Sequence, residues 1–374
     1  MTIDTSRTWA EISLENIKDN VKAIRAAMPE GTKFMGVVKA DAYGHGAVHV
    51  AEAIAEAGGD YLAVACFAEA AMLREAGISL PILILGITPP GYAEELRKLD
   101  ITQTVPSLEY AKALSKALQG QLKCHLKLDS GMSRTGFSWR EESLVDIIET
   151  MKLPKLNFEG VFTHFAVSDE PEKDFTITQF NRFMSTINSI EESCGHVFAI
   201  KHCANSGAVI NFREYALDMV RPGIMTYGMY PAAERGGIEL KSAMSLKSRV
   251  YAINELLPGD TVGYGRAYTV EKPMRVATIP VGYADGISRS LSGKLNVLIR
   301  GKRCPQIGRI CMDMLMVDIS CLDGCEIEDV VTLIGKDGAE EITADELAAK
   351  QGSINYEITC DVAPRVTRIY NCHV

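Results

Sequence analysis

The sequence predicts a (β/α)8 barrel of the TIM-barrel class, followed by a mostly β C-terminal domain. Between residues 33 and 240, short runs rich in Val, Ile and Leu alternate with stretches of helical periodicity. This alternation is typical of parallel strands joined by right-handed crossovers, and eight such units in about 200 residues fit a barrel. A doubly wound open sheet is the alternative, because strands are difficult to count from one sequence.

The eight candidate barrel strands are short apolar runs, and the segments between them carry helix signals. Ala47–Ala57 is rich in alanine, Ser107 can cap a helix over Leu108–Leu118, and Glu172–Ser193 has a long polar face. The predicted strands are Phe34–Val38, Tyr61–Ala65, Pro81–Leu85, Ile101–Val105, Cys124–Leu128, Phe158–Thr163, Val197–Lys201 and Leu217–Val220.

After residue 240 the rhythm changes to strand-like runs separated by turn residues, which indicates a β domain. One helix is expected at Ala344–Gln351, and the alternating run Thr8–Leu14 can join this domain as an extra strand. We therefore expect a barrel over residues 12–240 and a β domain over 241–374, joined by residues 1–11. The other predicted strands are Leu246–Ile253, Met274–Pro280, Val297–Ile299, Met314–Ile319 and Val330–Leu333.

The composition is that of a soluble globular protein, with 47% hydrophobic and 23% charged residues in a chain of 374. A net charge of -9 argues against a nucleic-acid partner. We find neither an apolar run of the ~20 residues that span a bilayer nor a secretory signal, so we expect the cytoplasm. The ten cysteines are expected to be reduced, and Cys321 and Cys325 lack the second pair that a zinc site needs.

Polar residues follow five of the predicted barrel strands. In such barrels the active site lies at the carboxyl ends of the strands. Each residue alone would be read as a loop residue or a surface charge, but five at one rim indicate a site. They are Lys39, Arg134, His164, Ser206 and Arg221.

Lys39 follows an apolar run, so its stem is expected to be desolvated. Desolvation favours the neutral amine, whose lone pair can attack an aldehyde. The small residues Ala40 and Ala42 beside it, with Gly44 and Gly46, permit close approach of another group. A lysine at a strand end can also extend into solvent, and spacing alone leaves both readings open.

Eight motifs resemble those of a known family, the alanine racemases, in the same order and spacing along the whole chain. The motifs are VVKADAYGHG at 37–46, THFA at 163–166, ANSG at 204–207, VRPGI at 220–224, GYG at 263–265, VGYADG at 281–286, GRICMDM at 308–314 and INYEI at 354–358. The resemblance implies a pyridoxal-phosphate enzyme, built from a barrel and a β domain, that interconverts L- and D-alanine and so supplies D-alanine for peptidoglycan. It also implies a head-to-tail homodimer with shared active sites.

By this resemblance Lys39 holds the cofactor as a Schiff base and acts as one of two bases. Racemisation removes a proton from one face of Cα and returns it to the other, so a second base must stand opposite Lys39. The match assigns this role to Tyr264, supplied across the dimer interface, with His164 and Arg221 as neighbours that assist the phenol. Arg221 also matches the partner of the pyridine nitrogen, although a structural ion pair is the simpler reading of that residue alone.

The resemblance assigns further residues to the cofactor, the substrate and an access corridor. Arg134 matches the arginine at the cofactor's phenolic oxygen and the substrate carboxylate, and Met312 of the partner subunit matches a backbone N–H that meets that carboxylate. The phosphate contacts are matched by Tyr43, Ser206, Gly223, Ile224 and Tyr356. The corridor, which would exclude larger amino acids, is matched by Tyr283, Arg289, Arg309 and Asp313.

Lys127 matches a lysine that the family carbamylates, which would turn a cation into an anion that orients Arg134. The motif departs from the family here, because Ser133 stands where glycine is usual. An unmodified Lys127 paired with Asp129 is the alternative.

Three other functions are alternatives to alanine racemisation. An amino-acid decarboxylase on the same barrel often uses a cysteine from the β domain, and Cys311 keeps that reading open. A cofactor carrier would lack the second domain. A serine-preferring racemase is disfavoured by the bulk of Tyr356, although one extra group changes binding by only ~1–3 kcal/mol. No metal is expected, because His45 and His49 lack a third ligand.

Overall fold

The structure, a computed structural model, describes residues 7–371. The chain divides into two compact units. One comprises residues 16–42 and 47–241, and the described part of the other comprises 7–15, 43–46 and 242–371. Every helix within residues 7–371 is too short or too polar to cross a bilayer.

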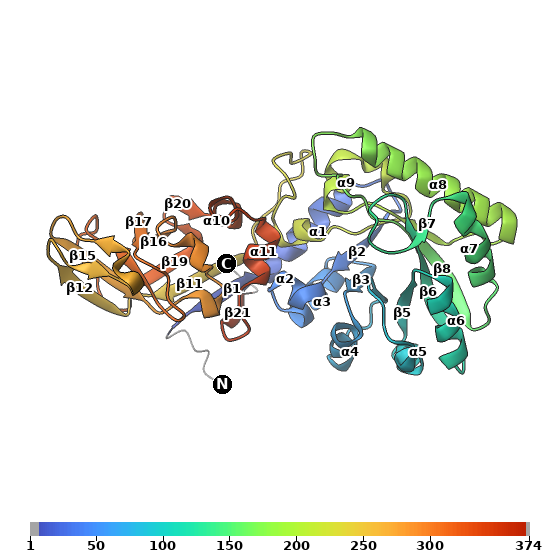
Figure 1. Ribbon diagram of the computed structural model, residues 1–374, viewed down its shortest axis with the longest axis horizontal. Coiled ribbons are helices and arrows are strands. Elements are labelled where there is room, and N and C mark those ends of the chain that lie inside the picture. Colours follow the sequence, from blue (N-terminus) through green and yellow to red (C-terminus); the bar gives the residue numbers. More distant parts are fainter. Residues whose placement is uncertain (1–6, 372–374) are drawn as a thin grey trace. The chain divides into compact units, whose positions relative to one another are not determined.

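The first unit is built on eight parallel strands in the order β10-β2-β3-β4-β5-β6-β8-β9 (Figure 1). Backbone N–H groups of Asp218 and Arg221 donate to Lys201 and Ala204 at 3.1 and 2.9 Å, which joins β10 to β9 and closes the barrel. The predicted barrel is confirmed, and the open sheet is excluded. The strands are β2 (Lys33–Val37), β3 (Tyr61–Val64), β4 (Ile82–Ile84), β5 (Ile101–Val105), β6 (Leu122–Asp129), β8 (Leu156–Phe162), β9 (Ile200–His202) and β10 (Met219–Val220), with β7 (Phe137–Ser138) beside β6.

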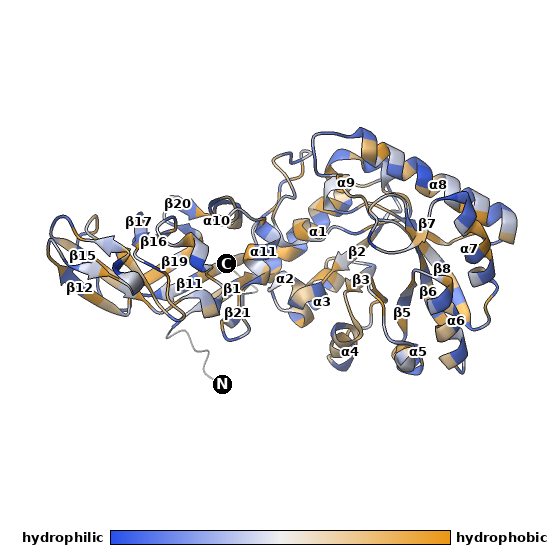
Figure 2. Ribbon diagram, viewed as in Figure 1, coloured by the Kyte–Doolittle hydropathy of each residue, from blue (hydrophilic) through white to orange (hydrophobic). Residues whose placement is uncertain are grey.

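Helices alternate with these strands along the chain, and their sequences explain where they begin. Ser107 caps α6 by accepting a hydrogen bond from the Tyr110 N–H at 3.3 Å, as predicted. The long helix α8 alternates hydrophilic and hydrophobic residues, as an amphipathic helix on a barrel does (Figure 2). The helices are α1 (Leu14–Ala26), α3 (Ala47–Glu56), α4 (Phe67–Glu75), α5 (Ala93–Lys98), α6 (Leu108–Ala117), α7 (Leu144–Met151), α8 (Asp174–Cys194) and α9 (Ser206–Asn211).

The second unit is mostly β, with a main sheet in the order β12-β15-β18-β17-β16-β19-β11-β1-β21. Strand β1 pairs antiparallel with β11 and parallel with β21, so the N-terminal run joins this sheet as the sequence suggests. The strands are β1 (Trp9–Ser13), β11 (Met244–Arg249), β12 (Ala252–Leu256), β13 (Thr261–Val262), β14 (Tyr268–Thr269), β15 (Met274–Ile279), β16 (Asn296–Ile299), β17 (Lys302–Ile307), β18 (Leu315–Asp318), β19 (Val330–Asp337), β20 (Glu340–Ile342) and β21 (Thr367–Asn371), and the helices are α10 (Ala344–Gln351) and α11 (Asn355–Cys360).

The run Leu246–Ile253, predicted as one strand, is two strands with different partners. Strand β11 pairs with β19, whereas β12 pairs with β15. Between them the N–H groups of Val250 and Tyr251 donate to Asp329 and Thr278 at 2.9 and 2.8 Å, so the chain changes partners at this point. The apolar pattern continues through the change, which is why the sequence does not reveal the break.

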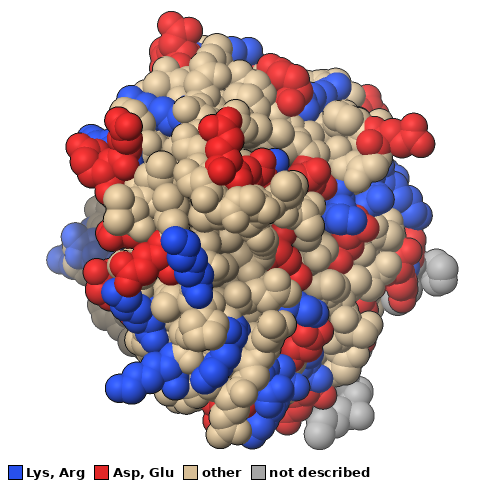
Figure 3. Space-filling view, turned by 90° about the vertical axis from the view of Figure 1, so that its right-hand side faces the viewer, with Lys and Arg blue, Asp and Glu red and all other residues tan. Residues whose placement is uncertain are grey.

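The charged surface side chains are of both signs. Figure 3 shows Lys and Arg interspersed with Asp and Glu on the face that it presents. Such a mixture is typical of a protein that does not bind a polyanion through this face.

Candidate active site

Polar side chains converge at the carboxyl ends of the barrel strands, as the sequence predicts. Lys39 follows β2, and His164 and Arg221 follow β8 and β10. Burial is the main cause that lowers the pKa of His164 well below its usual value, and nearby positive charges add to it. Those charges belong to Arg221, Arg134, Lys127 and Lys39, in order of decreasing effect. His164 is therefore a neutral imidazole among four basic side chains.

Arg221 is fixed by four hydrogen bonds within the barrel. Its Nη1 bonds to Nδ1 of His202 at 2.8 Å, and its Nη2 donates to the Thr163 and Cys203 carbonyls at 2.8 and 3.3 Å. Nη2 also lies 3.3 Å from Nδ1 of His164. Burial lowers the pKa of Arg221 to about 10, so it stays protonated at neutral pH.

The structural ion pair considered for Arg221 is not found. Among the described residues Arg221 has no carboxylate within 4.0 Å, and its Nε carries no hydrogen bond. Nε of Arg221 is therefore available to donate a hydrogen bond to a ligand.

Behind Arg221 a chain of buried imidazoles runs through the barrel interior. Because the guanidinium can only donate, Nδ1 of His202 accepts and its Nε2 carries the proton. Nε2 of His202 then donates to Nδ1 of His125 at 2.8 Å, and Nε2 of His125 faces the Glu159 carboxylate at 3.6 Å. Burial lowers the pKa of both histidines, so this network is neutral up to Glu159.

Sequence reasoning missed the roles of His202 and Glu159 in this chain. The sequence places His125 on the same strand face as Lys127. Its hydrogen-bonding neighbours, His202 and Glu159, lie on other strands, so the sequence does not indicate the contacts. A histidine at the end of an apolar barrel strand, as His202 is, was the available signal. Phe162 stacks on His202 with ring centroids 4.9 Å apart and an angle of 11° between the rings, which fixes the orientation of the imidazole.

Lys127 is buried on β6, beneath the loop that carries Arg134. Its Nζ donates to the Leu128 carbonyl at 2.7 Å and lies 5.4 Å from the centre of the Phe162 ring. Burial lowers the pKa of Lys127 to about 7, which gives a substantial neutral fraction at physiological pH.

The alternative pairing of Lys127 with Asp129 is not found. No ion pair within 4.0 Å joins them. The oxygens of Asp129 instead accept backbone N–H groups of Gly131, Ser133 and Arg134 at 2.8, 3.1 and 3.0 Å. Asp129 therefore shapes the loop that positions Arg134.

Ser133 has a φ of 58°, in the left-handed region that glycine enters without strain. This explains why glycine is usual there. For serine this conformation costs about 1 kcal/mol, which the hydrogen bond from the Ser133 N–H to Asp129 helps to offset. The loop holds its shape despite the substitution.

We expect Ser133→Gly to raise the free energy of unfolding by about 0.5–1 kcal/mol, because it removes the strain of the left-handed backbone. Urea unfolding followed by circular dichroism would measure the change. Ser138→Gly, in strand β7, is the control and should destabilise the protein. Equal destabilisation by both substitutions would contradict the strain at Ser133.

Lys39 leads into a left-handed turn, labelled α2 (Lys39–Tyr43), in which Ala40, Asp41, Ala42 and Tyr43 have φ of 51–54°. Left-handed residues cost roughly 1–2 kcal/mol each, so surrounding contacts must hold the turn. Oε1 of Glu69 accepts the Ala40 N–H at 2.8 Å, and Oδ1 of Asp41 accepts the Ala47 N–H at 2.7 Å. The turn gives Lys39 a fixed backbone at the end of β2.

Ser206 begins helix α9, and its buried Oγ has no hydrogen-bond partner among the described residues. Asn205 caps this helix by accepting the Ala208 N–H at 3.0 Å, so the Ser206 hydroxyl is not needed as the cap and is available to bind a ligand. Gly223 and Ile224, at the start of the 3₁₀ turn Ile224–Tyr227, follow the adjacent strand β10. An orphaned hydroxyl beside a helix start suits an anion.

Tyr43 and Tyr356 belong to the second unit, and their rings lie 6.0 Å apart. Burial raises the pKa of Tyr43 above its usual range, so its hydroxyl remains a donor. The two predicted phosphate-contacting tyrosines are thus brought together.

The predicted partner-facing residues also gather in the second unit. Tyr264 is 70% exposed and Met312 is 52% exposed, and both line a hollow of about 650 Å³ together with Cys311 and Asp313. Tyr283 donates its N–H to the Cys311 carbonyl at 3.1 Å.

The remaining corridor residues lie around the same loop. The Arg309 guanidinium packs against Gly265, where an added Cβ would lie 2.9 Å from it. Arg289 lies near enough to Cys311 for its positive charge to act on that thiol. Asp313 pairs with Arg365 at 2.8 Å. Burial raises the pKa of Cys311, which argues against a thiolate nucleophile.

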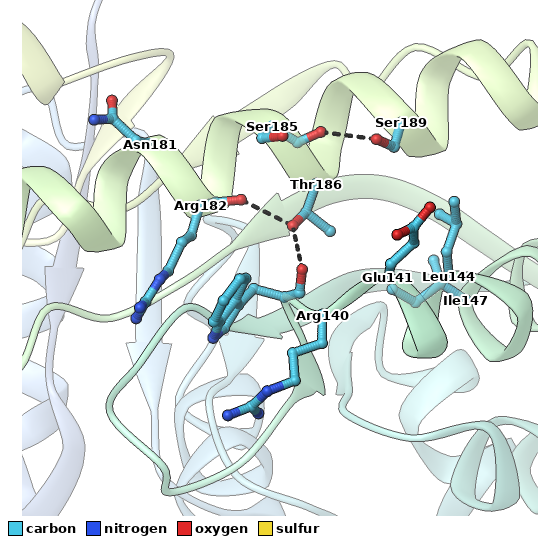
Figure 4. Close-up of a pocket in the computed structure, with 10 residues that line it drawn as sticks. Arg140, Glu141, Leu144, Ile147, Asn181, Arg182, Ser185, Thr186 and Ser189 are labelled. Carbon is cyan, nitrogen blue, oxygen red and sulfur yellow. Dashed lines mark hydrogen bonds between the residues drawn. The ribbon is translucent and has the colours of Figure 1, made fainter.

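One further hollow contains none of the predicted site residues, and His45 and His49 form no metal site with other described residues. A hollow of about 460 Å³ lies between α7 and α8, with Arg140 and Arg182 at one end (Figure 4). His49 pairs with Glu52 at 3.4 Å. Within residues 7–371 no group of three or more His, Cys, Asp or Glu side chains is arranged to hold a metal ion.

Family models identify both parts of the chain. Residues 12–231 match the model described as alanine racemase, N-terminal domain, and residues 243–370 match alanine racemase, C-terminal domain. The alanine racemase of Desulforamulus reducens is 44% identical over 367 residues, covering 97% of this chain and 98% of that protein.

Solved structures agree. Alanine racemase from Clostridium difficile 630 has a TM-score of 0.93 at 43% identity, covering 98% of this chain and 96% of that one. The Bacillus anthracis alanine racemase with bound L-Ala-P has a TM-score of 0.92 at 38% identity, covering 97% and 95%. The chain therefore belongs to the alanine racemase family.

Proposed function

We propose that this protein interconverts L- and D-alanine with pyridoxal 5'-phosphate bound at the carboxyl ends of the barrel strands. The observation that carries the proposal is the cluster of Lys39, Arg221 and neutral His164 at that rim. The family membership supports it, and the Bacillus anthracis relative holds the alanine analogue L-Ala-P.

The residues present fit this cofactor. The orphaned Oγ of Ser206 and the helix starts at Ser206 and Ile224 suit its phosphate. Tyr43 and Tyr356 are proposed as further phosphate donors because they match the family's phosphate contacts. Nε of Arg221 is the donor left for the cofactor's ring nitrogen. When bound, pyridoxal phosphate supplies an electron sink that makes the Cα–H bond of the amino acid acidic.

Racemisation then depends on two bases of the protein. The Lys39 amine removes or returns the Cα proton on one face, and the Tyr264 hydroxyl acts on the other face. Nδ1 of neutral His164 accepts from Arg221, so its Nε2 carries the proton and can donate a hydrogen bond to the phenolic oxygen, which favours loss of the phenol proton. Arg221 keeps its own proton at neutral pH, which limits the electron sink and favours return of the proton to Cα.

Arg134 and Met312 are proposed to hold the substrate carboxylate, the first with its guanidinium and the second with its backbone N–H. Carbamylation of Lys127 is part of the proposal, because an amine with a pKa of about 7 has the free lone pair that reacts with carbon dioxide. The resulting anion would pair with Arg134. Tyr283, Arg289, Arg309 and Asp313 are proposed to line the access corridor and exclude larger amino acids.

A second copy of this chain is the proposed partner. Tyr264 and Met312 are strongly exposed although the reaction needs both, and they line an apolar hollow. A head-to-tail homodimer would cover that hollow and give each active site a Tyr264 from its neighbour. We assign cofactor binding to residues 12–240 and the completing β domain to 241–374 with residues 1–11.

We further propose that the enzyme works in the cytoplasm and supplies D-alanine for peptidoglycan. Neither a nucleic acid nor a membrane is a proposed partner. The decarboxylase reading is disfavoured by the protonated state of Cys311.

The test is a chiral assay of the purified protein with a panel of L-amino acids. We expect D-alanine as the main product and at least about tenfold slower conversion of serine, since one added group changes binding by ~1–3 kcal/mol. Release of carbon dioxide would indicate a decarboxylase, and no conversion at all would indicate a carrier. A faster reaction with serine than with alanine would contradict the proposed substrate.

A further inference from the structure

Two cysteine sulfurs lie in contact in the β domain, away from the residues assigned to racemisation. The Sγ atoms of Cys304 and Cys321 are 3.8 Å apart. Cys304 is buried in strand β17, whereas Cys321 is exposed shortly after strand β18.

The pair sits at one end of a hairpin. Strands β17 and β18 pair antiparallel through Gln306 with Val317 and Ile307 with Met316. The segment between the strands, residues 308–314, carries Arg309, Met312 and Asp313. A bond between Cys304 and Cys321 would therefore close the open end of the hairpin whose other end presents those residues.

Cys325 is the neighbour that could compete for either thiol. Its thiol bonds to Asp329, and its carbonyl accepts from Arg275 at 3.2 Å. These contacts engage the Cys325 thiol with Asp329 and its carbonyl with Arg275. The Cys321 carbonyl accepts from Lys302 Nζ at 3.2 Å, which holds the segment of Cys321 against β17.

We propose that Cys304 and Cys321 are a reversible oxidation site that reacts with small-molecule disulfides to form an intramolecular disulfide. Exposure makes Cys321 the attacking thiol, and contact makes Cys304 the resolving thiol. The sulfurs must approach from 3.8 Å to the ~2.05 Å of a disulfide bond.

The steps balance with glutathione disulfide as the oxidant. The Cys321 thiolate attacks one glutathione sulfur, the sulfur–sulfur bond of the oxidant breaks, and one glutathione thiolate leaves. Cys304 then attacks Sγ of Cys321 and expels the second glutathione. The first thiolate accepts the Cys304 proton, and the second takes from solvent the proton that Cys321 released. Two protein thiols are oxidised by two electrons, and one glutathione disulfide is reduced to two thiols.

The two thiols differ in a way that fits these roles. Burial raises the pKa of Cys304 above its usual range, so buried Cys304 is a poor first nucleophile and exposed Cys321 reacts first, with the Cys304 sulfur 3.8 Å away to follow. The reduced form should therefore persist where glutathione is mainly reduced, and the disulfide should form when glutathione disulfide accumulates.

The experiment treats the whole protein with glutathione disulfide, blocks the remaining thiols with an alkylating reagent and maps the peptides without reduction. We expect peptides containing Cys304 and Cys321 to be linked, and dithiothreitol to reverse the link. Closing a loop of about 16 residues should raise the Tm by about 3–6 °C.

Three variants separate this site from other thiol chemistry. Cys321→Ser should abolish the link and the Tm shift, and Cys304→Ala should leave glutathione attached to Cys321. Cys325→Ser, the matched control on the same segment, should behave like the unmodified sequence. Alkylation of both thiols after treatment, or a link from either one to Cys325, would overturn the proposal. Racemisation is not needed for the readout, so the result is independent of the proposed function.

Discussion

Mixing two inactive variants, Lys39→Ala and Tyr264→Phe, should restore racemisation. Each substitution alone removes one of the two bases, so each should lower the rate by about 100- to 10,000-fold. In a heterodimer, one site combines Lys39 of the second variant with Tyr264 of the first and is intact. The other site carries both defects, so up to half of the normal activity per heterodimer should return.

This result depends on where Tyr264 acts. Tyr264 is 70% exposed in the single chain, which is what a residue that completes a neighbour's site requires. The mixture is incubated under subunit-exchange conditions, and mass spectrometry counts the heterodimers. The control is a mixture of Tyr268→Phe with Lys39→Ala. Tyr268 is not a proposed base, so the activity of this mixture should depend only on how many sites contain Lys39. Heterodimers that form without regaining activity would show that Tyr264 acts within its own chain or is not a base.

Replacement of Arg221 by glutamate should have the second largest effect. The guanidinium keeps its proton at neutral pH, whereas a glutamate would let the ring nitrogen of the cofactor become protonated. The substrate carbanion would then be better stabilised and less quickly reprotonated at Cα. We expect racemisation to fall by about 100-fold or more and pyruvate, the by-product of transamination, to rise relative to D-alanine.

A control is needed because Arg221 also bonds to His202 and to the Thr163 and Cys203 carbonyls. Loss of these bonds can destabilise the barrel whatever the chemistry. Arg221→Lys keeps the positive charge and loses much of the same network, so it should lose activity without producing more pyruvate. Equal pyruvate from both variants would assign the effect to structural damage.

The strands of the barrel could be predicted because each is a short apolar run between turn signals, and burial on both faces demands that pattern. The strand β17 could not, since Lys302, Arg303 and Pro305 interrupt its apolar residues and its pairing is set by distant strands. The break at Val250 likewise depends on partners far along the chain.

Site residues that directly follow a barrel strand could be predicted from the sequence. Features that depend on contacts between distant residues could not. Lys39 and Arg221 stand at such ends, but the left-handed turn after Lys39 contains no glycine in Ala40–Tyr43 that would announce it. The chain from Arg221 through His202 and His125 crosses three strands, which no local pattern encodes. Resemblance supplied Tyr264, which spacing alone could not single out.

The most direct test of the account asks which lysine carries the cofactor. The purified protein is incubated with pyridoxal phosphate, reduced with borohydride and digested, and the peptides are mapped by mass spectrometry. The account predicts that the pyridoxyl group is found on Lys39, with Lys127 unlabelled. A label on Lys127 or on any other lysine would contradict it.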